Sequence, residues 1–274
     1  MANPTDILLV DSATALKETA AGKVVVAGSQ GSVLPANLVA RVRARAAILH
    51  DAGIGKDEAG VSALPYCETL GMAAATVAGR TARISDAKDM AARGIISRVN
   101  SLAAKLGVVP GMACREAAER LIRAAQPHTV PPPYDEANAR FLAREGRIGL
   151  KAWALDSNSH LRESDAGHIV LTGSHGGLVG GRPESALRVK ALAAVFNDAG
   201  ICLDGSSTSR LPVLDEWGIA AATVSAASAR ISDGRSTYQD GVLSVVNDRA
   251  RALGAREGLS ARDFVELVLR AHGG

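Results

Sequence analysis

A serine and a histidine stand side by side between glycines in Thr-Gly-Ser-His-Gly at residues 172–176, and a related segment, Ala-Gly-Ser-Gln-Gly, spans residues 27–31. Glycine permits positive φ and a close approach of the backbone, so N–H groups at such turns can cradle a phosphate, a carboxylate or an oxyanion. We therefore expect Ser174 to act as a nucleophile or oxyanion partner and His175 as an acid–base group.

Small residues flank each of these serines two positions away on both sides. In this respect the segments resemble the nucleophile elbow of α/β-hydrolases, and Ser-His-Gly-Gly at residues 174–177 resembles the His-Gly-Gly oxyanion loop of esterases. The resemblance ends at these residues, since each half of the chain is too short for that family, and it assigns no family. A glycine turn whose serine caps the next helix is the structural alternative.

Aspartate and arginine recur in two further pairs of segments. Asp-Ala-Gly-Ile begins at Asp51 and at Asp198, and Ala-Arg-Ile-Ser-Asp contains Arg83 and Arg230. We expect Asp198 to orient a base and the arginines to clamp a carboxylate or phosphate through two parallel hydrogen bonds. The structural alternatives are an Asx turn for the aspartates and, for each arginine, a salt bridge to the aspartate three residues later.

The related segments also differ at titratable positions. His50 stands opposite Asn197 in the alignment of the two halves, and His175 stands opposite Gln30, so each half has one imidazole in the loops that follow its predicted strands. Both histidines are acid–base candidates at physiological pH. The predicted catalytic residues are Ser174, His175, Asp198 and His50, and the predicted substrate-binding residues are Ser29, Gln30, Asp51, Lys56, Arg83, Asn197, Ser228 and Arg230.

Two other differences add reactive side chains. Lys56 replaces the leucine of the second half and would serve as an anion anchor or a perturbed base. Cys202 replaces a glycine of the first half and could form a Cys–His pair with His175, although a small buried residue is the favoured alternative.

These segments belong to a sequence that repeats itself. Residues 11–18 return 145 positions later as residues 156–163, and residues 82–86 return 147 positions later as residues 229–233. Agreement along a whole half predicts two copies of one structural unit. Positions at which the copies agree constrain a shared scaffold or a shared site, and positions at which they differ show where one copy has specialised.

Each copy contains four apolar runs that predict strands covered on both faces, as in a parallel sheet. They span residues 7–10, 24–26, 46–49 and 73–77, and then 152–155, 169–171, 193–196 and 220–224. Helices are expected between them and around residues 99–106 and 114–124, with counterparts at 246–253 and 261–269. The predicted fold is α/β, a tandem duplication of a doubly wound, mostly parallel-sheet, Rossmann-like unit with pseudo-two-fold symmetry.

The predicted domains are residues 1–125, a linker at 126–148 and residues 149–274. Prolines make residues 126–133 a stiff extended segment, and the charged residues 134–147 predict a connecting helix. The repeated polar residues follow the carboxyl ends of the predicted strands, where open α/β sheets bind ligands. We therefore expect one site at this rim, between the lobes, with complementary residues from each copy.

The composition narrows the functional classes. A net charge of +3 and 3% aromatic residues argue against a nucleic-acid partner, and no run has the length and apolarity of a membrane span. Three scattered cysteines and the absence of a secretion signal predict a cytoplasmic protein. Dinucleotide-binding, phosphate-loop and metal-binding motifs are absent, so we expect no cofactor and no metal.

The sequence therefore favours a cofactor-independent enzyme that acts on a small polar or anionic metabolite, by hydrolysis of an amide, imide or ester. Isomerase or lyase chemistry by the same acid–base groups is the nearest alternative. A non-catalytic two-lobed protein that binds a small anion, and a scaffold without a small-molecule site, are the others. The duplication also makes a homo-oligomer conceivable.

Overall fold

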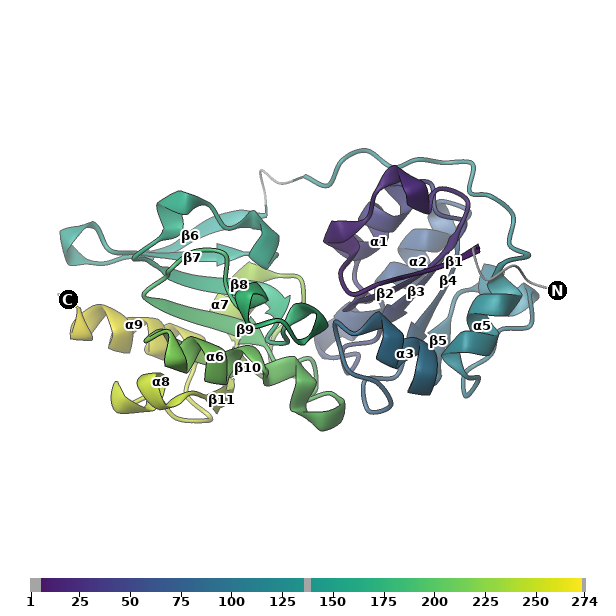
Figure 1. Ribbon diagram of the computed structural model, residues 1–274. Helices are drawn as coiled ribbons and strands as arrows, with labels where there is room; N and C mark the ends of the chain where they lie inside the picture. Colours follow the sequence, from purple (N-terminus) through teal and green to yellow (C-terminus); the bar gives the residue numbers. More distant parts are fainter. Residues whose placement is uncertain (1–5, 136–138, 273–274) are drawn as a thin grey trace. The chain divides into compact units, whose positions relative to one another are not determined.

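The computed structural model describes residues 6–135 and 139–272, and the chain divides into two compact units. The first comprises Met1–Ile54, Glu58–Tyr134 and Cys202–Asp204, and the second Gly55–Asp57, Asp135–Ile201 and Gly205–Gly274. Each unit is α/β, with one mixed, mostly parallel sheet (Figure 1).

Where the structure describes the first unit, it has five strands in the spatial order β1-β2-β3-β4-β5. Neighbouring strands from β1 to β4 are parallel, and β5 is antiparallel to β4. Strands β2, β3 and β4 are buried along their whole length. Their bounds are β1 Ile7–Val10, β2 Val24–Gln30, β3 Ala46–His50, β4 Ala73–Val77 and β5 Ile96–Val99.

The described residues of the second unit form six strands in the order β11-β10-β9-β8-β7-β6. Strands β7 to β10 are parallel neighbours, whereas the outer strands β6 and β11 are antiparallel to theirs. From β7 to β11, this unit repeats the strand order of the first. The bounds are β6 Arg140–Glu145, β7 Lys151–Leu155, β8 Ile169–His175, β9 Ala193–Asn197, β10 Ala220–Val224 and β11 Leu243–Val246.

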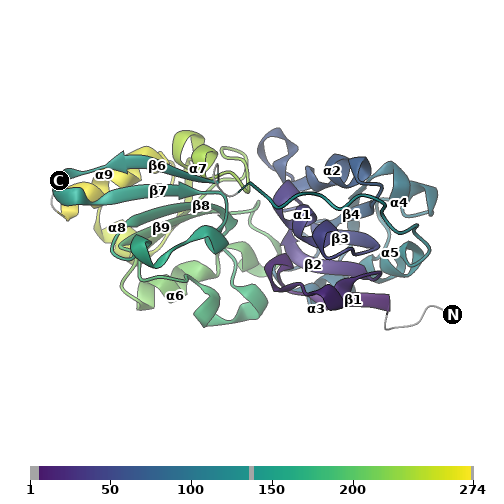
Figure 2. The same cartoon turned by 90° about the horizontal axis from the view of Figure 1, so that it is seen from above.

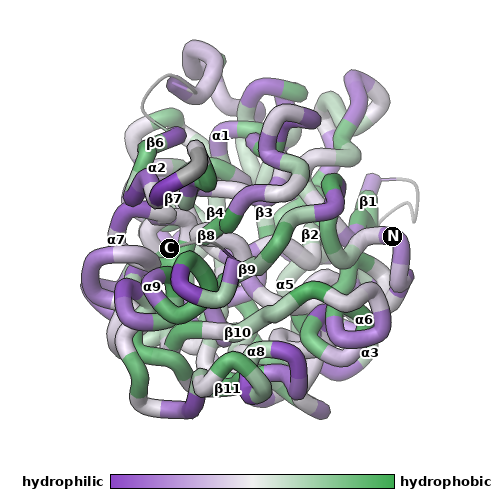
Figure 3. The backbone as a smooth tube through the Cα atoms, turned by 90° about the vertical axis from the view of Figure 1, so that its left-hand side faces the viewer, coloured by the Kyte–Doolittle hydropathy of each residue, from purple (hydrophilic) through white to green (hydrophobic). Residues whose placement is uncertain are grey.

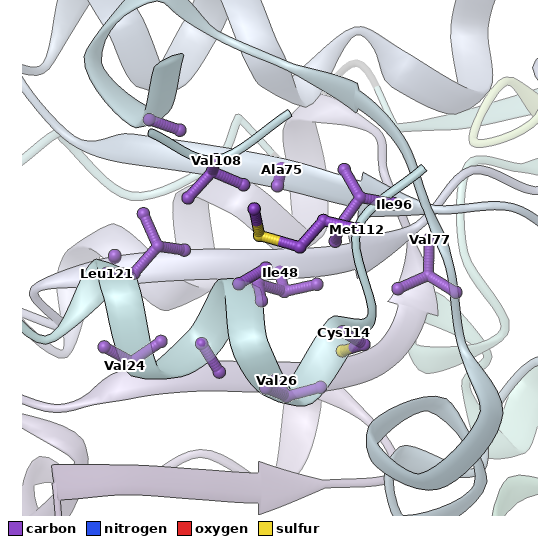
Figure 4. Close-up of a cluster of buried hydrophobic side chains, with 14 of the residues drawn as sticks. Val24, Val26, Ile48, Ala75, Val77, Ile96, Val108, Met112, Cys114 and Leu121 are labelled. Carbon is purple, nitrogen blue, oxygen red and sulfur yellow. The ribbon is translucent and has the colours of Figure 1, made fainter. Parts of the chain in front are cut away.

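Helices cover both faces of the first sheet. Residues alternate along β2, so Val24 and Val26 face one layer of helices while Val25 faces the other. Figure 4 shows the first of these cores, in which Ile48 and Leu121 pack beside Val24 and Val26. Helices α3 Ala87–Arg93, α4 Ser101–Lys105 and α5 Cys114–Leu121 cover this face, and α1 Val33–Arg41 and α2 Ala63–Thr69 cover the other.

The second sheet also has a core on each face. Phe264 and Val268 of α9 close one core, and Leu211 and Leu214 of α6 close the other. Figure 3 shows hydrophobic and hydrophilic stretches alternating along α9, as expected for a helix with one buried face. The helices of this unit are α6 Arg210–Glu216, α7 Gly234–Asp240, α8 Asp248–Ala252 and α9 Ala261–Ala271.

The first unit has a helix where the second has an irregular loop. Helix α1 connects β2 to β3, but residues 176–192 between β8 and β9 form only two short 3₁₀ turns, Val179–Gly181 and Pro183–Ser185. This β8–β9 loop is the largest difference between the two sheets' connections.

The predicted connecting helix at residues 134–147 is wrong where the structure describes it, because residues 140–145 form strand β6. Phe141 lies opposite Ala154 of β7, and Ala143 packs against the core. The alternation of these side chains outweighs the charge pattern that suggested a helix. Residues 136–138 of this prediction lie outside the described residues.

Strands β5 and β11 are absent from the sequence prediction, which places helices from Val99 and from Val246. Both residues end a strand, and Asn100 and Asn247 then cap the short helices α4 and α8. Each asparagine also bonds the neighbouring parallel strand, through the N–H of Ala74 or of Ala221. The predicted extended segment at residues 126–133 does lie against the first unit, where the Pro132 carbonyl accepts a hydrogen bond from Asn37.

Candidate functional site

The two glycine–serine segments form bulges at the carboxyl ends of β2 and β8. Residues 27–29 lie opposite the single residue Leu49, and residues 172–174 lie opposite Phe196. Bulges of this kind redirect a strand and its side chains. Each bulge brings a buried serine against the loop that follows a neighbouring strand, β1 in the first unit and β7 in the second.

Both serines make the same bond there. Ser29 Oγ accepts the N–H of Ala13 at 2.9 Å, and Ser174 Oγ accepts the N–H of Asn158 at 2.9 Å. Because the bond recurs in both units, it explains the repeated serine as a loop anchor. The nucleophilic role of Ser174 stays a prediction.

The N–H groups beside these serines do not form the open anion cradle that the glycines suggest. The N–H of Gly31 donates to the His50 carbonyl at 2.6 Å, and that of Gly176 donates to the Asn197 carbonyl at 2.9 Å. The next N–H in the second unit, that of Gly177, donates to His175 Nδ1. These donors are therefore satisfied within the protein, and those of Gly31 and Gly176 join adjacent strands.

The Asp-Ala-Gly-Ile segments form left-handed turns. Ala52, Gly53 and Ile54 have φ values of +48°, +70° and +64°, and their counterparts at 199–201 have +49°, +74° and +49°. Positive φ is strained for a β-branched residue such as isoleucine, so the surroundings must hold this conformation.

Asp51 and Asp198 hold these turns in place. Asp51 Oδ1 accepts the N–H groups of Gly53 at 3.0 Å and Gly79 at 2.9 Å. Asp198 Oδ1 accepts those of Gly200 and Ala226, both at 2.8 Å. The predicted Asx turn is thus present in both units, and the roles of Asp51 in substrate binding and of Asp198 in orienting a base stay predictions.

His50 is fully buried, and the backbone engages both of its ring nitrogens. Nδ1 accepts the N–H of Ala52 at 3.1 Å, and Nε2 lies 3.1 Å from the Ala82 carbonyl. Asn197 has the same two partners in the second unit, since Oδ1 accepts the N–H of Ala199 and Nδ2 donates to the Ala229 carbonyl. An Nε2-protonated imidazole and an amide therefore form the same two hydrogen bonds with the backbone. Because both ring nitrogens of His50 are engaged in these bonds, neither is left to bind a substrate.

Burial holds the pKa of His50 below its usual value of 6.5, because water is excluded from the charged form. The unfolded chain binds a proton as the pH falls below 6.5, while folded His50 stays neutral, so stability is present above pH 6.5 and is lost on acidification. We expect the wild type to lose more stability than His50→Asn between pH 6.5 and pH 5, because only the wild type has this buried imidazole. Urea unfolding across this range measures the difference, and parallel pH profiles would contradict the assignment.

The predicted anion clamps are engaged in ion pairs within their units. Arg83 binds Asp204 at 2.7 Å rather than Asp86, which caps α3. Arg230 binds Asp233, as the structural alternative predicts, and also Asp57. All of these side chains are partly exposed, so a competing anion would meet screened and already neutralised charge.

The remaining predicted ligands also have partners. Lys56 belongs to the second unit, where its Nζ lies 3.0 Å from Asp240. Ser228 Oγ donates to the Ser225 carbonyl and accepts the N–H of Val242. Gln30 is buried at the end of β2 and is paired in register with His50.

Cys202 is buried in the first unit, whereas His175 lies in the second. A Cβ added at Gly79 would lie 3.3 Å from Cys202 Sγ and 3.0 Å from His50 Cε1, so both side chains lie close to Gly79. The favoured alternative, a small buried residue, matches this environment.

The second unit contains a buried arginine that sequence reasoning missed. Arg210, at the start of α6, is 3% exposed and forms no ion pair with any residue that the structure describes. Nε donates to the Gly177 carbonyl at 2.9 Å, Nη1 donates to the Ala186 carbonyl at 2.6 Å, and the guanidinium lies over the Phe196 ring. Burial lowers the pKa of Arg210 to about 10.

Arg210 and His175 are connected through one residue. Gly177 donates its N–H to His175 Nδ1 at 3.1 Å and accepts the Arg210 Nε–H with its carbonyl. Neither side chain has an equivalent in the first unit, where Gln30 and Ala63 occupy the corresponding positions. The two polar residues that distinguish the second unit are therefore brought together at the carboxyl end of β8.

Among residues 6–135 and 139–272, no three His, Cys, Asp or Glu side chains are grouped so that they could hold a metal ion. None of the helices described is both long and apolar enough to cross a membrane. The chain matches no protein-family model, no curated protein and no solved structure in comparisons with known proteins.

Proposed function

We propose that this protein is a cofactor-independent enzyme that acts on a carbonyl group of a small anionic metabolite. In this proposal Arg210 attracts the anion and His175 is the acid–base group. The observation that carries it is the buried guanidinium of Arg210, which forms no ion pair with the described residues and is connected through Gly177 to the imidazole of His175.

A buried charge without a counter-charge is costly, and proteins seldom retain one. The two hydrogen bonds of Arg210 use Nε and one N–H of Nη1, so Nη2 donates to no residue that the structure describes. An anionic ligand would supply both the missing charge and the missing acceptors, because carboxylates and phosphates match the guanidinium fork. The two carbonyl bonds also tether the β8–β9 loop, which gives Arg210 a structural role as well.

The hydrogen bond to Gly177 determines what His175 can do. Because Nδ1 accepts an N–H, the proton of the neutral ring lies on Nε2. Such a ring donates to a carbonyl oxygen and stabilises the negative charge that develops there. Hydrolysis of an amide, imide or ester, and proton transfer beside a carbonyl as in isomerases and lyases, both need this donor.

We also propose that the two units arose by tandem duplication of a Rossmann-like unit. The matching strand orders and the equivalent bonds of His50 and Asn197 support this origin. After duplication the second unit acquired His175, Arg210 and an irregular β8–β9 loop. Cys67, Cys114 and Cys202 are buried and form no disulfide, which supports the proposal that the protein works in the cytoplasm.

Anion binding is tested by thermal unfolding with a panel of small carboxylates, imides, amides and phosphates. We expect at least one anion to stabilise the wild type, by about 2.7 kcal/mol at 100 times its Kd. Arg210→Met should lose this stabilisation, because it keeps an apolar stem but no charge. His50→Asn, in the other unit, is the matched control and should respond like the wild type.

Circular dichroism establishes that Arg210→Met is folded before the panel is read. If the same anions stabilise Arg210→Met and the wild type equally, Arg210 does not bind them and its role is the loop tether alone. Failure of every anion to stabilise the wild type would likewise count against the proposed site.

A further inference from the structure

Strand β1 ends its sheet, and no strand lies on its outer edge among the described residues (Figure 2). The corresponding strand of the second unit, β7, has the same register on its inner neighbour: Ile7 pairs with Val24 as Ala152 pairs with Ile169. There β6 occupies the outer edge and runs antiparallel to β7. The second unit thus shows which kind of strand pairs with the outer edge of the strand that corresponds to β1.

The sequence of β1 leaves its edge unprotected. Ile-Leu-Leu-Val contains no proline and no charge, which are the usual devices that keep edge strands from pairing. Leu9 is 39% exposed, whereas Ala154 at the matching position of β7 is 1% exposed and lies opposite Phe141 of β6. A strand on the β1 edge would cover Leu9.

Charge indicates which kind of strand fits. Lys151 of β7 lies opposite Glu145 of β6, and the position that matches Lys151 in the first unit is Asp6. A partner should therefore carry lysine or arginine there. A second copy of β1 fits poorly, since a symmetric antiparallel pair centred between Leu8 and Leu9 sets Asp6 opposite Asp11, and like charges in that position destabilise a sheet.

We propose that the outer edge of β1 binds an extended segment of another protein that runs antiparallel to it. The segment has apolar residues opposite Leu8 and Leu9 and a basic residue opposite Asp6. Backbone hydrogen bonds supply the affinity, and the apolar and basic side chains supply the selectivity. This surface is independent of His175 and Arg210.

The probe is a fluorescein-labelled peptide, Ala-Arg-Phe-Leu-Ala-Arg-Lys, which is the sequence of residues 139–145 with lysine in place of Glu145. We expect it to bind the full chain about fivefold more tightly than the peptide that ends in glutamate. Hydrogen exchange should show new protection at residues 7–10. Asp6→Lys should reverse the preference, and Leu9→Lys should weaken binding of both peptides.

Each alternative result overturns the proposal. If neither peptide binds at millimolar concentration, the β1 edge is not a binding surface. If the preference for the lysine peptide is unchanged in Asp6→Lys, Asp6 does not select a basic residue. Protection that appears on β7 rather than β1 means that the peptide displaces β6. Protection of residues 7–10 that rises with protein concentration alone, without peptide, identifies a second copy as the occupant.

Discussion

Replacement of Gly173 by alanine is expected to lower the free energy of unfolding by about 3 kcal/mol or more. Gly173 does not have a positive φ, so the expected cause is the steric clash of the added Cβ. A Cβ at this position would lie 2.3 Å from the Asp233 nitrogen and 2.6 Å from the Ser232 carbonyl carbon. Backbone cannot rotate away as a side chain can, so the bulge of β8 or the turn before α7 must move.

Gly167→Ala is the matched control in the same unit. It has a φ of +72° but no heavy atom within 4 Å of an added Cβ, so we expect a loss of about 1 kcal/mol. Urea unfolding of the two variants and the wild type measures the contrast. Equal losses would mean that the close approach of the two loops does not constrain Gly173.

The sequence predicted the parallel strands well for a physical reason. Strands β2, β3, β8 and β9 are buried on both faces, and each contains a continuous apolar run, as expected for strands covered on both sides. The outer strands are harder to predict, because β5 and β11 have four residues each and β6 contains three charged residues. Their pairing depends on the neighbouring strand, which no local pattern reveals.

The candidate site shows a different limit of sequence reasoning. Repetition correctly marked Asp51, Asp198 and the two bulge serines as constrained, but the bonds that they make anchor loops. Repetition alone does not distinguish a scaffold from a site. Arg210 was missed because its counterpart is Ala63, and only shared positions and rim loops were considered. An arginine directly before the apolar run Leu-Pro-Val-Leu, where the first half has alanine, was the available signal.

His175→Gln is expected to reduce turnover of the substrate about 100-fold or more while the protein stays folded. Glutamine is the residue at the matching position of the first unit, where it is buried at the end of β2, so the fold accepts it. A glutamine side chain can still donate a hydrogen bond but cannot transfer a proton at neutral pH. Ground-state binding through Arg210 should therefore persist.

The most direct measurement is the turnover of the anion that stabilises the wild type best. Chromatography detects its conversion by the wild type, His175→Gln and His50→Asn. The account predicts conversion by the wild type and by His50→Asn, and binding with little or no conversion by His175→Gln. Undiminished conversion by His175→Gln would contradict the assignment of the acid–base role to this histidine. Binding without conversion by the wild type itself would make the protein a carrier or sensor of the anion instead of an enzyme.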